Sequence, residues 1–400
     1  MLTSLALVFL VGLALASIFQ KLKLPRIIGM LITGIVLGPY VLDLFDESIL
    51  AISAELRRLA LVIILIKAGL ALDIQDLKKV GRPAVLMSFL PAVFEILALV
   101  AFAPFLLGVT RTEAAIMGAV LGAVSPAVVV PRMVQLMDER YGTDKSIPQM
   151  ILAGASLDDV FVIVLFSTFI SMEQGSGAHF MDFVNIPVSI VLGILLGAVV
   201  GFGLAWFFEA NYSRHHLVRN SMKVIIVRGV SFLLLAAEEM LEGVIAVSGL
   251  LAIMSMSMVL AKRSVPEVTG RLQEKYGKLW LAAELILFVL VGAAVDIRYT
   301  LGAGISAIGM IFLALIFRSV GVFLCLLGTP LNQKEKLFCI IAYLPKATVQ
   351  AAIGSIPLSL GLPCGNMVLS VAVLSILLTA PLGALGIDWT YRRLLHGENA

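Results

Sequence analysis

The sequence has few charged residues for its length. Asp, Glu, Lys and Arg make up 14% of its 400 residues, whereas roughly a quarter of an ordinary soluble domain is charged. Hydrophobic residues make up 60%, and the mean hydropathy is +1.06. A soluble core does not accommodate so many apolar side chains, so the composition indicates a single transmembrane unit over residues 1–400. The net charge of +3 is small, and most Lys and Arg residues lie in short loops. We therefore expect no nucleic acid partner.

Cysteine is also scarce, and its spacing excludes the usual metal sites. The three cysteines, Cys325, Cys339 and Cys364, lie in or near apolar segments and have no ligand spacing for zinc or haem. The sequence lacks an HExxH motif and a convincing serine nucleophile constellation. We therefore expect buried thiols, no cofactor and no enzyme activity. Four histidines fall in loops or the tail, where solvated side chains are the default and pH sensing is the alternative: His179, His215, His216 and His396.

Long apolar runs recur along the whole sequence. A helix of on the order of 20 residues crosses about 30 Å of hydrocarbon. The first run, from Leu2 to Phe19, lacks the basic n-region of a signal peptide, so we interpret it as a helix of the mature protein. We predict an all-α polytopic membrane protein with about 13 transmembrane helices: residues 2–19, 25–42, 56–73, 83–107, 113–131, 148–171, 184–208, 222–240, 243–261, 279–296, 301–327, 337–359 and 364–387.

The loop charges predict an orientation. We number the connections between successive predicted spans from the N-terminus. Most Lys and Arg lie in the odd-numbered connections and the C-terminal tail, whereas the even-numbered connections hold only Arg57, Arg58, Arg111 and Arg298. Lys and Arg collect in cytoplasmic loops. We therefore predict a multi-pass cell membrane protein with its N-terminus outside and its C-terminus in the cytoplasm.

Several charges fall inside the predicted spans. A charge at mid-bilayer costs about 3 kcal/mol on insertion scales, so such residues usually face a protein cavity and mark a transport path or an ion pair. The basic ones are Lys67, Arg228, Arg318 and Lys346, and the acidic ones are Glu95, Asp158, Asp159, Glu238, Glu239 and Glu284. The sequence assigns no partners to Lys67, Arg228, Glu238, Glu239 and Glu284.

Two spans are interrupted by proline, and their positions indicate an internal repeat. Segment 113–131 contains Pro126 and Pro131, and segment 337–359 contains Pro345, so each loses regular helical hydrogen bonds near its middle. They stand seven spans and about 220 residues apart, so they cross the membrane in opposite directions, as an inverted repeat requires. We expect the ion site at the midplane, where the two interrupted helices cross.

Asp158 and Asp159 are the strongest candidates for that site. Adjacent helix positions differ by about 100° in azimuth, so the two acids do not form the face-to-face dyad of an aspartyl protease. Burial and a neighbouring like charge both favour the protonated form of a carboxyl group, so one acid is suited to exchange a proton for a cation. Na⁺ and Li⁺ prefer oxygen ligands, and Ser125 and Thr348 are further candidates. The alternatives are helix capping for the hydroxyls and a structural ion pair for the acids.

Buried acids need compensating charge, and Arg318 and Lys346 are the candidates. A guanidinium group does not release its proton in proteins, whereas a buried lysine can. We therefore expect Arg318 to brace the site. Lys346 either supports the helix crossing or tunes the aspartates.

The motifs together resemble a known family. GAVSPAVVVP around Ser125, GASLDD ending at Asp159, buried Arg318, LPKATVQAAIG around Lys346 and the early LPRIIGMLITGIVLGP are similar to the monovalent cation/proton antiporter superfamily (CPA), most of all its NHA branch of Na⁺(Li⁺)/H⁺ exchangers. The resemblance implies a homodimer, scaffold or dimerisation helices mainly in 1–82 and 184–296, and an elevator-like ion-transport core mainly in 83–171 and 301–387. It implies Asp159 as the principal carrier of cation and proton, with Asp158 as its partner.

The residue at 318 bears on stoichiometry. In electrogenic relatives a lysine matches Arg318, whereas the NHA branch resembles this chain in having arginine there and a glutamate matching Glu95. Our hypothesis is an Arg318–Glu95 ion pair, which also has a purely structural interpretation, and electroneutral one-for-one exchange. The alternatives are a K⁺/H⁺ antiporter on the same fold, an ion channel and an organic-anion symporter.

Overall fold

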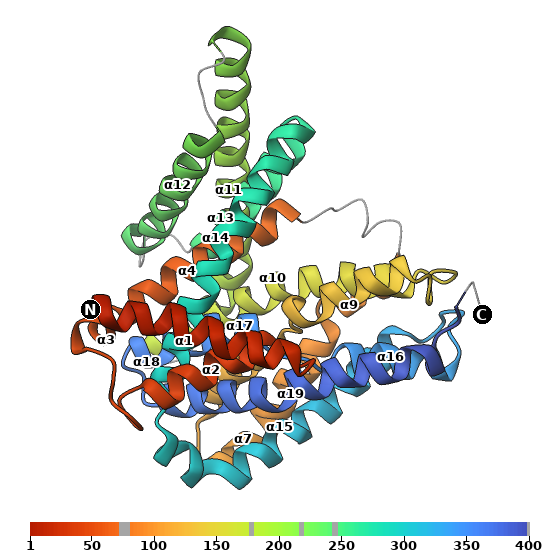
Figure 1. The fold of residues 1–400 in the computed structure, drawn as a ribbon. Coiled ribbons are helices and arrows are strands. Elements are labelled where there is room, and N and C mark those ends of the chain that lie inside the picture. Colours follow the sequence, from red (N-terminus) through yellow and green to blue (C-terminus); the bar gives the residue numbers. More distant parts are fainter. Residues whose placement is uncertain (72–80, 176–179, 216–219, 242–246, 398–400) are drawn as a thin grey trace. The chain divides into compact units, whose positions relative to one another are not determined.

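The computed structural model describes residues 1–71, 81–175, 180–215, 220–241 and 247–397, and in these ranges the regular structure is helical (Figure 1). The first half contains α1 (Leu2–Lys21), α2 (Arg26–Leu37), α3 (Glu47–Ala51), α4 (Ser53–Ala71), α6 (Arg82–Met87), α7 (Leu90–Leu107), α8 (Arg111–Gly122), α9 (Pro126–Asp138) and α10 (Ile147–Gln174). The second contains α11 (Phe180–His215), α12 (Asn220–Leu241), α13 (Gly249–Arg263), α14 (Pro266–Ala293), α15 (Ile297–Cys325), α16 (Gln333–Ala342), α17 (Thr348–Gly354), α18 (Ile356–Ser359) and α19 (Gly365–Leu394).

Each of the thirteen expected spans coincides with one helix or with consecutive helices, so the all-α prediction is confirmed. Within the described ranges, six helices are long and apolar enough to cross a membrane by length and composition: Leu2–Lys21, Arg82–Leu107, Val191–Glu209, Pro266–Ala293, Gly304–Cys325 and Gly365–Leu394. The expected boundary at 279 is wrong, because α14 begins at Pro266. Its first half is polar and is stabilised by pairs such as Glu274–Lys278 at 2.6 Å, one turn apart, which hydropathy does not detect.

The chain divides into two compact units. Unit 1 comprises Met1–Ala54, Ile74–Ile170 and Leu285–Ala400, and unit 2 comprises Glu55–Asp73 and Ser171–Glu284. In unit 2, α11 and α13 pack closely because glycine lines their contact. A Cβ at Gly197 would overlap the Ala252 carbonyl oxygen, and Ser255 Oγ donates to the Ile194 carbonyl at 2.8 Å. Small residues let two membrane helices approach in this way.

Both predicted helix breaks are present in unit 1. The first separates α8 from α9, where Pro126 takes the first helical position and needs no N–H partner. The second separates α16 from α17 and contains Pro345. The Ser125 N–H donates to the Pro345 carbonyl at 2.8 Å, so the two breaks touch. The two discontinuous helices therefore meet at their interrupted middles, as the sequence predicts.

The elements around the breaks repeat in order. A long helix, a broken helix and another long helix follow one another as α7, α8–α9 and α10, and again as α15, α16–α17 and α19. Helices α7 and α15 lie against each other, and α19 contacts α8, α9 and α16. This arrangement is the predicted inverted repeat with two crossed discontinuous helices.

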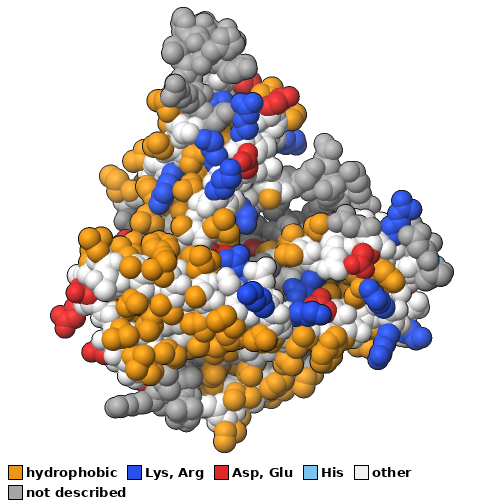
Figure 2. All heavy atoms as spheres, viewed as in Figure 1, with side chains coloured by type: hydrophobic (Ala, Val, Ile, Leu, Met, Phe, Trp, Pro, Cys, Tyr) orange, Lys and Arg blue, Asp and Glu red, His pale blue; other side chains and the backbone are white. Residues whose placement is uncertain are grey.

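Three of the basic connections lie at one end of unit 1. Lys145, between α9 and α10, pairs with Glu335 at the start of α16 at 2.9 Å. The Gly142 N–H donates to the His396 carbonyl at 2.8 Å, which holds the C-terminal tail to the same connection. Figure 2 shows Lys and Arg gathered over this end, where α9 and α19 end and α16 begins. The connections predicted to share one side of the membrane are thus adjacent, and the side itself stays a prediction.

Candidate functional site

Five of the predicted charged residues meet in the buried centre of unit 1. Glu95 comes from α7, Asp158 and Asp159 from α10, Arg318 from α15, and Lys346 from the break between α16 and α17. Asp159 is 9% exposed, and the other four are at most 1% exposed. Residues separated by up to 251 positions in the sequence are therefore brought into hydrogen-bond contact.

Arg318 uses each of its guanidinium nitrogens. Its Nη1 lies 2.9 Å from Glu95 Oε2, and its Nη2 lies 3.1 Å from Asp158 Oδ2. Its Nε donates to the Tyr343 carbonyl at 2.7 Å, and Nη1 also donates to the Gly122 carbonyl. The expected Arg318–Glu95 contact is present, and it is part of a wider network. Only the planar five-donor fork of arginine suits so many acceptors at once.

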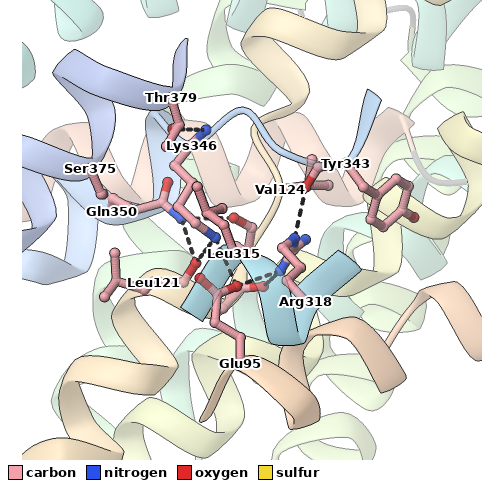
Figure 3. Close-up of polar contacts among 12 residues, drawn as sticks. Glu95, Leu121, Val124, Leu315, Arg318, Tyr343, Lys346, Gln350, Ser375 and Thr379 are labelled. Carbon is pink, nitrogen blue, oxygen red and sulfur yellow. Dashed lines mark hydrogen bonds and ion pairs between the residues drawn. The ribbon is translucent and has the colours of Figure 1, made fainter. Parts of the chain in front are cut away.

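Lys346 completes the charged network. Its Nζ lies 2.8 Å from the same Glu95 Oε2 that contacts Arg318, and it donates to the Leu121 carbonyl (Figure 3). Its backbone N–H donates to Thr379 Oγ1 at 3.0 Å, so α19 holds the break in place. Glu95 therefore joins the two cationic side chains of the second repeat.

The end of α8 is capped by side chains from the second repeat. The last carbonyls of a helix lack partners within the helix and carry the negative end of its dipole. Lys346 donates to the carbonyl of Leu121, Arg318 to that of Gly122, and Gln350 Nε2 to that of Ala123 at 2.8 Å. Sequence reasoning missed Gln350, Tyr343 and Thr379, because uncharged side chains in an apolar run carry no charge signal.

Several buried oxygen atoms in the site are left without a hydrogen-bond partner among the described residues. They are Glu95 Oε1, Asp158 Oδ1, Asp159 Oδ1, Ser125 Oγ, Thr348 Oγ1 and Tyr343 Oη. Ser125 occupies the N-cap position of α9 but makes no side-chain cap bond, so the expected capping alternative does not apply to it. Within the described ranges, no three His, Cys, Asp or Glu residues are grouped as a metal site. The available donors are thus a mixed set of oxygens, which suits a hard monovalent cation.

The two aspartates differ in how they are held. Asp158 Oδ2 accepts from the Val124 N–H at 2.8 Å and from Arg318 Nη2 at 3.1 Å. Asp159 forms no ion pair among the described residues, although Arg318 and Asp158 lie close enough to interact with it electrostatically. Of the two acids, Asp158 is therefore the more firmly held among the described residues.

The other charges expected in the spans belong to unit 2. Lys67 lies over the Trp280 ring at 5.8 Å and interacts electrostatically with Glu284, and Arg228 lies over the Phe232 ring at 5.6 Å. The side chain of Glu239 lies outside the described residues, as do His179 and His216. The three cysteines are buried and form no disulfide among the described residues, as expected.

The chain was compared with known proteins. The family model described as "Sodium/hydrogen exchanger, transmembrane" matches residues 5–393. Human sodium/hydrogen exchanger 9B2 is 34% identical over 388 residues, covering 93% of this chain and 70% of that protein. Human sodium/hydrogen exchanger 9B1 is 32% identical over 376 residues, covering 90% and 71% respectively.

A solved structure has the same fold. The sodium proton antiporter MjNhaP1 from Methanocaldococcus jannaschii aligns with a TM-score of 0.79 and 23% sequence identity, covering 98% of each chain. The fold, the family match and the relatives agree with the resemblance inferred from the motifs. This chain is a member of the transmembrane sodium/hydrogen exchanger family.

Proposed function

We propose that this chain exchanges Na⁺ or Li⁺ for protons, one for one, at a single site formed by Asp159 and Asp158. Family membership makes the chain a multi-pass membrane protein that exchanges a cation for protons. The choice of ion, the site and the stoichiometry are our proposal. The observation that carries it is the charge balance of the buried cluster.

The cluster contains three acids and two bases. When Glu95, Asp158, Arg318 and Lys346 are all ionised, their charges cancel through the three ion pairs at 2.8, 2.9 and 3.1 Å. One ionised carboxylate, on Asp159, is then left over. An uncompensated charge at this depth is strongly unfavourable. The cluster is neutral only when Asp159 carries one proton or one monovalent cation, so the two compete.

This competition gives coupling without net charge movement. A core that crosses only when it is neutral moves loaded with either a cation or a proton, and it returns with the other. Arg318 keeps its proton throughout, so it supplies no second proton. In this proposal Lys346, paired with Glu95 at 2.8 Å, also keeps its proton. Electroneutral one-for-one exchange then follows.

The unpartnered oxygens support an ion site beside Asp159. The free Oδ1 atoms of Asp158 and Asp159 and the hydroxyls of Ser125 and Thr348 are the oxygen donors we assign to the cation. Glu95, Arg318 and Lys346 are assigned to charge compensation. K⁺ also takes oxygen ligands, so a K⁺/H⁺ antiporter is the second candidate. The size of the ion site determines whether Na⁺ or Li⁺, or instead K⁺, binds there.

The family resemblance supports the larger-scale part of the proposal. Residues 83–171 and 301–387 form mainly the moving ion-transport core, and residues 1–82 and 184–296 form mainly the scaffold and the homodimer interface. The core carries its site across the membrane by elevator-type alternating access. The basic connections support a C-terminus in the cytoplasm and an N-terminus outside the cell membrane, because Lys and Arg collect in cytoplasmic loops.

Reconstitution in liposomes tests the function directly. Purified protein is placed under an imposed pH gradient, Na⁺, Li⁺ or K⁺ is added, and lumenal pH is followed beside an Asp159→Asn variant. We expect Na⁺ and Li⁺ to move protons in the wild type and no cation to do so in the variant. Equal responses in both proteins would rule out Asp159 as the carrier. No response to any cation in the wild type would favour a channel or an organic-anion symporter.

A voltage-clamped preparation tests the stoichiometry. Proteoliposomes with a pH gradient and Na⁺ on one side should show proton movement without a steady current. A current that depends on Na⁺ and reverses with the pH gradient would overturn the one-for-one ratio while leaving the antiport itself intact.

A further inference from the structure

We infer that Gln350 is a positioning residue that acts on Asp158 through the peptide group between Ala123 and Val124. The inference rests on the proposed function and adds to it an uncharged residue that sets the behaviour of the ion site. Gln350 is fully buried and is separated from Ala123 by 227 positions in the sequence.

The amide of Gln350 is fully engaged by the two helix breaks. Its Oε1 accepts from the Ala347 N–H at 2.8 Å, within the second break. Its Nε2 donates to the Ala123 carbonyl at 2.8 Å in the first break, and more weakly to the Leu121 carbonyl at 3.4 Å (Figure 3). One side chain thus supplies an acceptor to one break and donors to the other.

The Ala123 carbonyl and the Val124 N–H belong to one peptide group. Gln350 holds the carbonyl end of this group, and the N–H end donates to Asp158 Oδ2 at 2.8 Å. A hydrogen bond accepted by the carbonyl polarises the peptide and strengthens its N–H as a donor. It also fixes the plane of a peptide that lies outside any helix, since α8 ends at Gly122 and α9 begins at Pro126. Gln350 therefore orients and strengthens a direct partner of Asp158.

The chemistry of the position favours glutamine over charged residues of similar length. A glutamate would add a fourth acid to the buried cluster, and a lysine would add a third cation. Either one would upset the charge balance that one proton or one cation completes at Asp159. A neutral amide alone combines an acceptor for Ala347 with two N–H donors for the α8 carbonyls.

The effect belongs to cation binding. Asp158 Oδ2 is held by the Val124 N–H at 2.8 Å and by Arg318 Nη2 at 3.1 Å, so a peptide that is no longer fixed holds this carboxylate less firmly. The Oδ1 atom of the same carboxylate is one of the oxygens that we assign to the cation. Loss of the Gln350 amide should therefore weaken cation binding at the site.

Gln350→Met is the direct test, because methionine is similar in length and lacks the amide. We expect its KM for Na⁺ to rise about threefold with little change in kcat. Ser375→Ala is the matched control: Ser375 is as fully buried, and its Oγ donates to the Ala372 carbonyl of its own helix at 2.7 Å. This control should keep the wild-type KM.

A second comparison separates positioning from general support. Thr379→Val removes a buried hydrogen bond to the second break, at the Lys346 N–H, without touching the Ala123–Val124 peptide. If Thr379→Val raises the KM for Na⁺ as far as Gln350→Met, or if folded Gln350→Met has the wild-type KM, the inference is overturned. A wild type that exchanges no cation would instead overturn the proposed function.

Folding of the variants is checked by gel filtration and thermal unfolding before transport is measured. If Gln350→Met does not fold, Gln350→Leu replaces it, because leucine also lacks the amide and adds no charge to the cluster. The same rise in KM supports the inference. Failure of both variants to fold would make Gln350 a residue of the fold alone and would overturn its role as a positioning residue.

Discussion

Arg318 shows how much a single buried side chain contributes to this site. It contacts two carboxylates and two backbone carbonyls, and its guanidinium carbon lies 5.6 Å from the centre of the Tyr343 ring. Lysine offers three donors from a single nitrogen and cannot reach acceptors spread around a plane. The arginine therefore sets the geometry of the site as well as its charge.

Replacement of Arg318 by lysine should impair both stability and exchange. Several buried acceptors lose their donor, and breaking one buried ion pair alone costs about 3–5 kcal/mol. We expect the melting temperature to fall by at least about 5 °C and exchange to slow by at least about tenfold. Thermal unfolding in detergent and proteoliposome transport measure the two effects.

Arg132→Lys is the matched control for that experiment. Arg132 pairs with Asp388 at 2.9 Å, at the end of the unit and partly exposed. Exposed pairs contribute about 0–1 kcal/mol, so this variant should stay close to the wild type. An Arg318→Lys protein as stable and as active as Arg132→Lys would contradict our account of the site.

The sequence identifies the charged residues of the site but not their uncharged partners. Asp158, Asp159, Arg318 and Lys346 stand out because charge is rare in an apolar run. Gln350 does not stand out, because its role depends on the Ala123 carbonyl of a segment 227 positions away. Contacts between the two breaks become visible only when both repeats are folded together.

At the scale of helices, hydropathy predicts the apolar centres well and the ends poorly. The break at Pro345 follows from the lost N–H and ring clash of proline, and it is present between α16 and α17. The start of α14 at Pro266 does not follow, because its first turns are polar and amphipathic. Helix ends depend on capping and tertiary contacts, which an average of hydropathy over many residues does not detect.

The contact between α11 and α13 should be sensitive to side-chain size. Gly197→Val would place a branched side chain against the Ala252 backbone, and overpacking costs about 1–3 kcal/mol. We expect a melting temperature lower by about 2–6 °C, measured by thermal unfolding. Gly203→Ala on the same helix is the control, since no other atom lies within 4 Å of a Cβ added there. Equal melting temperatures for the two variants would mean that α11 and α13 do not depend on close approach.

The link between α9 and α19 should weaken in acid. Hydrogen bonds from Gln135 first, and then from Tyr391, with the nearby Arg392 charge, lower the pKa of Glu139 below its usual value. A carboxylate with a lowered pKa stabilises the folded state above its unfolded value, and this contribution is lost as pH falls through the folded value. Because Glu139 is near the surface, the contribution is a few tenths of a kcal/mol.

Thermal unfolding at pH 6 and pH 3.5 measures this contribution. The wild type should lose about 1 °C more than Glu139→Gln on acidification, since glutamine does not titrate. A larger acid loss in Glu139→Gln than in the wild type would show that the carboxylate does not stabilise this end of the unit.

At the scale of the whole molecule, we predict a homodimer. The chain has a mass of 42.8 kDa, so native mass spectrometry from a mild detergent should give a protein mass near twice that value. Dilution below the dissociation constant should yield monomer. A protein that stays monomeric at every concentration, in detergent and in nanodiscs, would remove the dimer from the proposal.

The acids of the site come from the first repeat and the bases from the second, and this order matters while the chain is being synthesised. The first repeat supplies Glu95, Asp158 and Asp159, and the second supplies Arg318 and Lys346. During translation the acids leave the ribosome about 160 residues or more before the bases that neutralise them. Until then, the nascent first repeat holds its acids without the basic partners that neutralise them, which is unfavourable in the membrane. Stable burial of the first repeat therefore depends on the arrival of the second.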